Sequence, residues 1–89
     1  MDTTPIVRLG SQERAVLSVL VANQHRVISR GELSKLAGLE GLSERRCDSV
    51  LVQIRRFLGP ESVTTVRGRG WRLAASALVQ ANAAIADER

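Results

Sequence analysis

The chain has 89 residues, enough for one compact domain, and its 44% hydrophobic and 25% charged content is that of an ordinary globular protein. No apolar run reaches the roughly 18–20 residues that a membrane-spanning helix needs. Cys47 is the single cysteine, which excludes an internal disulfide and gives no metal-ligand spacing. We therefore expect a cytosolic protein that uses no membrane, metal or cofactor.

Arginine dominates the charge. There are 13 Lys and Arg residues against 9 Asp and Glu, a formal net charge of +4. Residues 1–73 hold 12 of these basic residues, and a planar guanidinium suits phosphate and guanine edges. A polyanionic partner is thus slightly favoured over an inert basic surface. The chain has only two aromatic residues, too few for the stacking platforms of single-strand binders, which favours a duplex.

The first third of the chain predicts an extended segment, one helix and a very short strand. Pro5–Leu9 is expected to be an edge strand or an extended lead-in. Ser11 is a good N-cap, and apolar residues then recur at helical spacing, which predicts a helix over about 12–24. Val27–Ile28, two β-branched residues between polar neighbours, predicts a very short strand at best.

Two further helices are predicted, over about 30–37 and 44–58. Ser29 and Glu32 have the spacing of a capping box at the start of the shorter one. Ser43 is the expected N-cap of the longer one, which ends before a Gly-Pro pair.

The helix over 44–58 is predicted to be apolar on one side and basic on the other, at about 100° per residue. The apolar side carries Cys47, Val50, Leu51, Ile54, Phe57 and Leu58. The opposite side carries Arg45, Ser49, Val52 and Arg56, flanked by Arg46, Asp48, Gln53 and Arg55. In a major groove, arginine reaches phosphate or guanine, Gln53 can pair with adenine and Val52 can pack on a thymine methyl.

A basic hairpin follows this helix. Val63–Val66 and Trp71–Leu73 predict two strands around an Arg-Gly-Arg-Gly turn, in which the glycines supply positive φ angles. Arginines at its tip suit the negative potential of a narrow minor groove. We predict a mostly helical α+β fold, a three-helix winged helix-turn-helix with a C-terminal β-hairpin wing, over residues 1–73. A single basic helix face is at least as often a solvated surface as a DNA-binding one. Two basic elements after a helix-turn-helix pattern, however, favour DNA binding.

Four segments resemble the C-terminal effector domain of OmpR/PhoB-type response regulators. They are Val27–Leu33, Arg45–Asp48, Ile54–Pro60 and Thr65–Leu73. The last is the most specific, because the family's wing typically has an arginine-glycine-any-glycine-aromatic-arginine pattern, which Arg67–Arg72 matches. The resemblance covers residues 9–73.

The resemblance implies a bacterial, cytoplasmic, nucleoid-associated transcription factor. Its recognition helix over 44–58 would enter the major groove, and its wing over 63–73 the adjacent minor groove. The base-facing candidates are Asp48, Ser49, Val52, Gln53 and Arg67. The phosphate-facing candidates are Arg45, Arg46, Arg55, Thr65 and Arg69. Arg56 is added to them because it lies on the exposed face near the end of the helix. The family's N-terminal four-stranded sheet is reduced here to Pro5–Leu9 at most, and the loop before the recognition helix, which in the family can touch RNA polymerase, is short.

Four single residues have alternative interpretations. His25 has no ligand or carboxylate at useful spacing and is expected to be a surface residue rather than a catalytic base. Cys47 is expected to act as a small hydrophobe rather than a redox sensor. Trp71 is expected to pack the wing onto the core rather than stack on a base. Asp48 could orient Arg45 or Arg55, or accept from a cytosine amine.

Residues 74–89 form an alanine-rich tail with high helix propensity. They could form a helix or fray. Their apolar residues could pack on the chain's own core in place of the missing sheet, or form the contact of a homodimer.

We hypothesise sequence-specific binding of double-stranded DNA for transcriptional regulation. The alternative is a winged-helix protein-interaction module that docks on RNA polymerase, a sigma factor or another regulator. No pair of carboxylates, no nucleophile with a base and no phosphate-cradling loop is visible, so we do not expect an enzyme.

Overall fold

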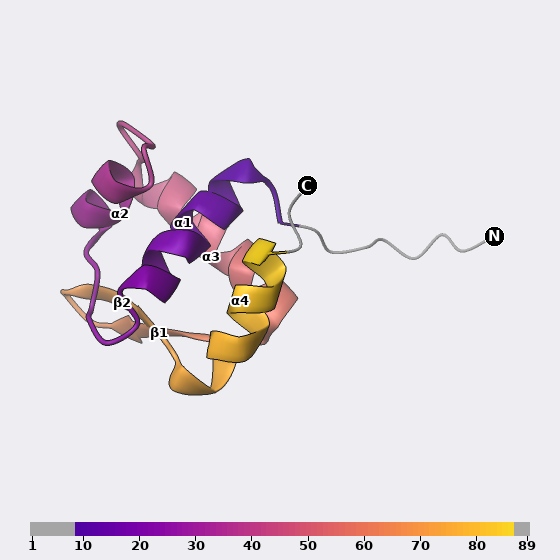
Figure 1. Ribbon diagram of the computed structural model, residues 1–89. Helices are drawn as coiled ribbons and strands as arrows, with labels where there is room; N and C mark the ends of the chain where they lie inside the picture. The colour runs from indigo at the N-terminus through magenta and orange to yellow at the C-terminus, as the bar shows by residue number, and fades with distance from the viewer. Residues whose placement is uncertain (1–8, 87–89) are drawn as a thin grey trace.

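The computed structural model describes residues 9–86, and most of the expected Pro5–Leu9 segment lies outside them. The elements in chain order are α1 (Ser11–Ala22), α2 (Arg30–Leu36), α3 (Glu44–Leu58), β1 (Val63–Val66), β2 (Gly70–Leu73), the 3₁₀ turn η1 (Ala75–Ala77) and α4 (Leu78–Ala86) (Figure 1). The predicted mostly helical α+β fold with a hairpin wing is confirmed. Within the described range, no helix is both long and apolar enough to cross a membrane.

The first helix differs from its prediction at both ends. It begins at Ser11 with Gly10 as N-cap, so the expectation that Ser11 caps it is wrong: the Gly10 carbonyl already accepts from the Arg14 amide at 2.9 Å. It ends at Ala22 rather than near residue 24. Asn23 is the C-cap, and the Val19 carbonyl accepts from both its backbone amide at 3.1 Å and its side-chain amide at 2.8 Å.

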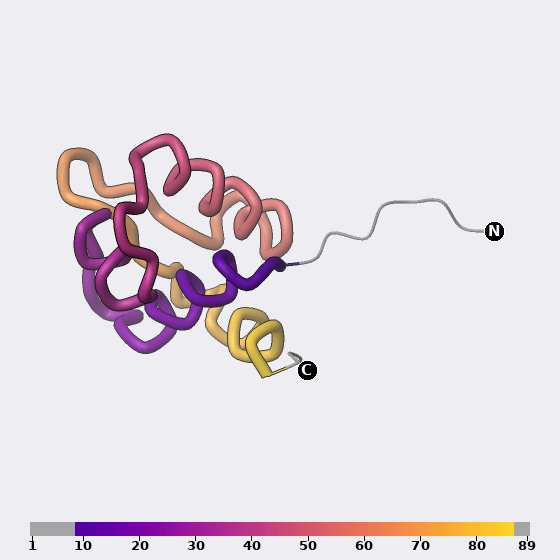
Figure 2. The backbone as a smooth tube through the Cα atoms, turned by 90° about the horizontal axis from the view of Figure 1, so that it is seen from above, coloured from indigo at the N-terminus to yellow at the C-terminus, as the bar shows by residue number. Residues whose placement is uncertain are grey.

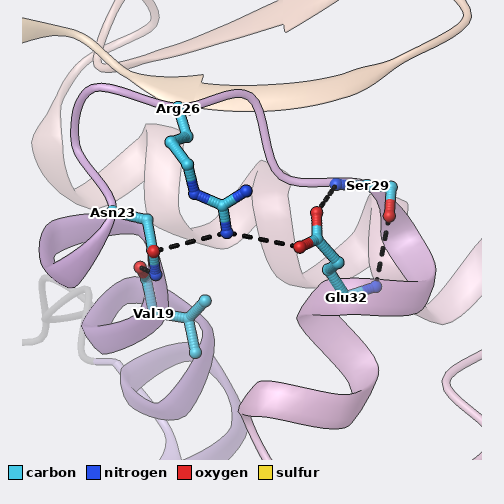
Figure 3. Close-up of polar contacts among 5 residues, drawn as sticks. All are labelled: Val19, Asn23, Arg26, Ser29 and Glu32. Carbon is cyan, nitrogen blue, oxygen red and sulfur yellow. Dashed lines mark hydrogen bonds and ion pairs between the residues drawn. The ribbon is translucent and has the colours of Figure 1, made fainter.

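The connection between α1 and α2 is held by a polar network (Figure 3). The predicted capping box is present: the Glu32 amide donates to Ser29 Oγ at 3.2 Å, and the Ser29 amide donates to Glu32 Oε1 at 3.5 Å. Arg26 Nη2 bridges Glu32 Oε2 at 3.2 Å and Asn23 Oδ1 at 3.4 Å. These contacts fix the start of α2 relative to the end of α1.

The wing is a two-stranded antiparallel hairpin whose register runs from Val63 opposite Leu73 to Val66 opposite Gly70. The short strand predicted at Val27–Ile28 is reduced to one bridge, in which Ile28 and Trp71 exchange backbone hydrogen bonds at 2.8 and 3.0 Å. Gly70 lies at this bridge with φ +146°, and a Cβ there would be 2.1 Å from the Ile28 carbonyl oxygen. Only glycine allows the wing to approach Ile28 so closely.

The core lies around α1, which is between α3 and α4 (Figure 2). The largest fully buried side chains include Leu17, Leu20, Ile28, Leu33, Leu51 and Ile54. Cys47 is also buried, as expected of a small hydrophobe. Burial raises the pKa of its thiol, the negative charge of Asp48 raises it further and Arg30 opposes both effects.

Phe57 lies on the apolar side of α3, but it is not part of the buried face. Its side chain is 40% exposed, although Ile54 on the same helix is fully buried. Phe57 lies about 80° from Cys47 around the helix, at the margin of the apolar stripe. It borders a shallow groove lined by Leu58 and by Gln80, Ala83, Ala84 and Ala86 of α4, and the alanines are too short to cover an aromatic ring.

Residues 78–86 form α4 and pack against α1 (Figure 1). Ala77, Ala81 and Ala84 are buried, whereas Val79 is 79% exposed. Small side chains on the inner face let this helix approach α1 closely.

Candidate nucleic-acid interface

The outer face of α3 is exposed because its inner face is fixed in the core. Cys47, Val50, Leu51 and Ile54 are buried, as the helical spacing predicts. Val52, on the opposite side, is 44% exposed. All the predicted site residues on α3 and the wing are exposed except Gln53 and Arg55, which are half-buried. An exposed valine among arginines is an apolar contact point on a basic surface.

The start of α3 is anchored by a cap and by a contact with α1. Ser43 Oγ accepts from the Arg46 amide at 3.0 Å, which confirms the predicted N-cap. The Arg46 side chain turns toward α1, where Nε donates to Gln12 Oε1 at 2.7 Å and Nη2 donates to the same oxygen. Sequence reasoning missed Gln12, because no local pattern connects residues 34 positions apart.

Arg55 points from the far end of α3 toward the wing. Its Nε and Nη2 donate to the Val63 carbonyl at 3.1 and 2.9 Å, and Nη2 also donates to Thr65 Oγ1 at 2.8 Å. The structure thus brings together Arg55 and Thr65, two predicted phosphate-facing residues. Val63 was not among the predicted site residues, because it takes part through its backbone carbonyl.

The tip of the wing carries two exposed arginines, Arg67 and Arg69. The Arg69 amide donates to the Val66 carbonyl at 2.9 Å, and Gly68 between the arginines has φ +73°. Within residues 9–86 neither arginine side chain is hydrogen-bonded or ion-paired to another residue. Both side chains therefore keep their donors for a partner.

Asp48 lies beside the wing rather than on the outermost line of α3. It lines a cleft of about 440 Å³ together with Arg30 at the start of α2 and with Thr65, Arg69 and Trp71 of the wing. In the described range it forms no ion pair with Arg45 or Arg55. Trp71 is half-buried against the core, as expected, and also lines this cleft.

A protein-family model described as "Transcriptional regulatory protein, C terminal" matches residues 3–73, most of the chain. The chain belongs to this family. The resemblance to OmpR/PhoB-type effector domains is therefore confirmed, and with it DNA-binding transcriptional regulation as the general role. The family is one of regulators and not of enzymes. No curated protein and no solved structure matches the chain.

The range matched by the family model contains the basic surface and ends before the last helix. All predicted site residues, from Arg45 to Arg69, fall within the matched range, whereas η1 and α4 come after it. The helix predicted to serve as the recognition helix corresponds to α3, and the predicted wing is the β1–β2 hairpin.

Proposed function

We propose that this effector domain regulates transcription by binding double-stranded DNA with sequence specificity. The recognition helix α3 enters the major groove, and the wing contacts the adjacent minor groove. One observation carries this proposal: α3 exposes Val52 among its arginines, and the wing that contacts this helix exposes two arginines at its tip. A helix fits the major groove, and an arginine-tipped hairpin suits a narrow minor groove.

Each exposed side chain has a chemical role in this proposal. Val52 packs on a thymine methyl, Gln53 pairs with adenine, Asp48 accepts from a cytosine amine, Ser49 bonds a base edge and Arg67 reads the minor groove. Phosphates are bound by the arginines at 45, 46, 55, 56 and 69 and by the Thr65 hydroxyl. These contacts supply affinity without sequence information, whereas the base contacts supply specificity.

The test is a selection from a pool of random duplexes at near-physiological salt, with the recovered sequences read out. We expect one motif, and its layout gives the assembly: a single site for a monomer, a repeat for a homodimer. A matched selection with Arg56→Ala should recover the same motif from weaker binding, because Arg56 is assigned to phosphate.

Recovery of no motif would overturn sequence-specific binding. Weight would then move to the alternative, a protein-interaction module for RNA polymerase, a sigma factor or another regulator. Direct binding of the purified domain to polymerase holoenzyme, measured in parallel, separates these outcomes. Under the proposal, the domain acts on the bacterial nucleoid in the cytoplasm.

A further inference from the structure

Arg55 differs from its neighbours because its side chain crosses from α3 to the first strand of the wing. Two of its nitrogens share the Val63 carbonyl, and one of them also reaches the Thr65 hydroxyl. A guanidinium presents its donors in a rigid planar fork, so the bonds fix direction as well as distance. Val63 and Thr65 are two residues apart on one strand, and holding both restricts the tilt of β1.

Hydrogen bonds join the wing to the rest of the domain at two places, one on each strand, while Val63 and Leu73 at its base are buried in the core. On one side, Trp71 and Ile28 exchange backbone hydrogen bonds. On the other strand, Val63 and Thr65 accept from Arg55. In the described part of the chain, these are the only side-chain hydrogen bonds between α3 and the wing. These hydrogen bonds act together with the buried Val63 and Leu73 to orient the tip, which carries Arg67 and Arg69.

We propose that Arg55 is a positioning residue that fixes the wing relative to the recognition helix. Major-groove and minor-groove contacts are then made at one spacing, a role that rests on the proposed function. The bond to Thr65 has a second effect. Because Oγ1 accepts from Arg55, the hydroxyl proton is directed elsewhere and is available to a phosphate oxygen. Arg55 thus orients a phosphate donor as well as the strand that carries it.

Arg56 provides a matched control for this role. It follows Arg55 on the same helix and is exposed, and its side chain bonds to no other residue in the described range. A contribution that arises from positive charge on α3 alone is shared by both residues. A contribution that arises from holding the wing belongs to Arg55.

The first experiment needs no DNA. Amide hydrogen exchange is measured by NMR for the wild-type domain, Arg55→Lys and Arg56→Lys. Lysine keeps the charge but cannot replace the fork, so Arg55→Lys should speed exchange in β1 and β2 by about tenfold. Arg56→Lys should leave it unchanged. The amides of Leu17 and Leu51 in the core report global unfolding and should be protected equally in all three proteins. Unchanged exchange of the wing in Arg55→Lys would overturn the positioning role.

The second experiment is a double-mutant cycle on DNA. Affinity for the selected duplex is measured for Arg55→Lys, Arg67→Ala and the double variant, with a parallel cycle that uses Arg56→Lys. If Arg55 directs the wing, Arg67→Ala should reduce DNA affinity by a factor at least about fivefold smaller in the Arg55→Lys background than in the wild type. In the cycle with Arg56→Lys, the two effects on affinity should be additive within about twofold. Additivity in both cycles would make Arg55 an independent phosphate contact and overturn the proposal. A wild-type domain without sequence preference would instead contradict the proposed function, and the exchange result would still decide the role of Arg55.

Discussion

Arg55 and Arg56 are neighbours on α3, yet the Arg55 side chain donates to β1 whereas the Arg56 side chain is exposed and bonds to no other residue within residues 9–86. Arg46 is a third case, since its guanidinium is held by Gln12 of α1. These side chains differ in how much freedom they lose when they bind phosphate. A guanidinium that is already fixed loses less conformational entropy when it binds. Arg46 and Arg55 are therefore better preorganised for binding phosphate than Arg56 is.

Val52 provides the sharpest test of base recognition. Val52→Ala removes two methyl groups from an exposed position without disturbing the core. We expect the recovered motif to change at one position and affinity for the original motif to fall by about 1 kcal/mol, the cost of a lost methyl contact. The salt dependence of binding should not change. Loss of affinity for all duplexes equally would mean that Val52 contacts no base.

Gly70 provides a test of the wing's attachment. In Gly70→Ala, the new Cβ meets the Ile28 carbonyl and the backbone keeps an unfavourable positive φ. We expect the free energy of unfolding to fall by about 3 kcal/mol, measured by denaturant titration. Gly68→Ala is the control, because its Cβ would meet open space and it should cost only about 1 kcal/mol. An equal loss of unfolding free energy in the two variants would show that residue 70 of the wing is not in close contact with the Ile28 backbone.

Cys47 should be unreactive while the domain is folded. Its thiol pKa is raised by burial, and the thiolate is the form that reacts with alkylating agents. Labelling by iodoacetamide at pH 8, followed by mass spectrometry, should be about a hundredfold slower in the native protein than in denaturant. The raised pKa also means that the native state holds this proton more tightly than the unfolded state. The contribution of this thiol to the free energy of unfolding is complete below its pKa in the unfolded state. That contribution is lost as the pH rises through its higher pKa in the folded state. Rapid native labelling would contradict the burial of Cys47.

At the scale of elements, α4 is held by small buried side chains against α1. Ala81 is fully buried and Ala83, on the same helix, is exposed. Ala81→Asp places a carboxylate in the core and should lower the free energy of unfolding by at least about 2 kcal/mol. Ala83→Asp, the matched control, should cost less than about 0.5 kcal/mol.

The same pair of variants separates the two roles considered for the tail. If α4 belongs to the core of a single chain, Ala81→Asp lowers the unfolding temperature at every protein concentration. If α4 instead forms the contact of a homodimer, the aspartate variants change the mass measured by light scattering. That second result, with unchanged stability of the monomer, would contradict the packing of α4 on α1.

At the scale of the whole molecule, charge should govern affinity. Five arginines are assigned to phosphate, and each releases counterions on binding. We expect log K to fall with log salt with a slope of about −4 to −5. Arg69→Ala should weaken binding to all duplexes about equally and reduce the magnitude of that slope by about 1, whereas Arg69→Lys should keep it. An unchanged slope in Arg69→Ala would remove Arg69 from the phosphate contacts.

Local patterns determined most of the elements. Ser29, Ser43 and the apolar spacing after each fixed the starts of α2 and α3, because a cap and a stripe act within one or two turns of a helix. The Arg-Gly-Arg-Gly turn likewise specified the hairpin. Phe57 and the start of α1 could not be placed in this way. Whether a marginal aromatic is covered depends on which helix packs beside it, and Gly10 caps α1 with a carbonyl that any residue carries.

The sequence by itself therefore determined the fold family, the basic face of α3 and the arginines at the wing tip. Periodicity, caps and a family-specific hairpin all depend on residues that lie close together in the sequence. Only the tertiary structure decided that Arg46 is held by Gln12, that Arg55 is held by Val63 and Thr65, and that Asp48 lies in the cleft beside Arg69. Each of these contacts joins separate elements, and the packing of α1, α3 and the wing brings their side chains within bonding distance.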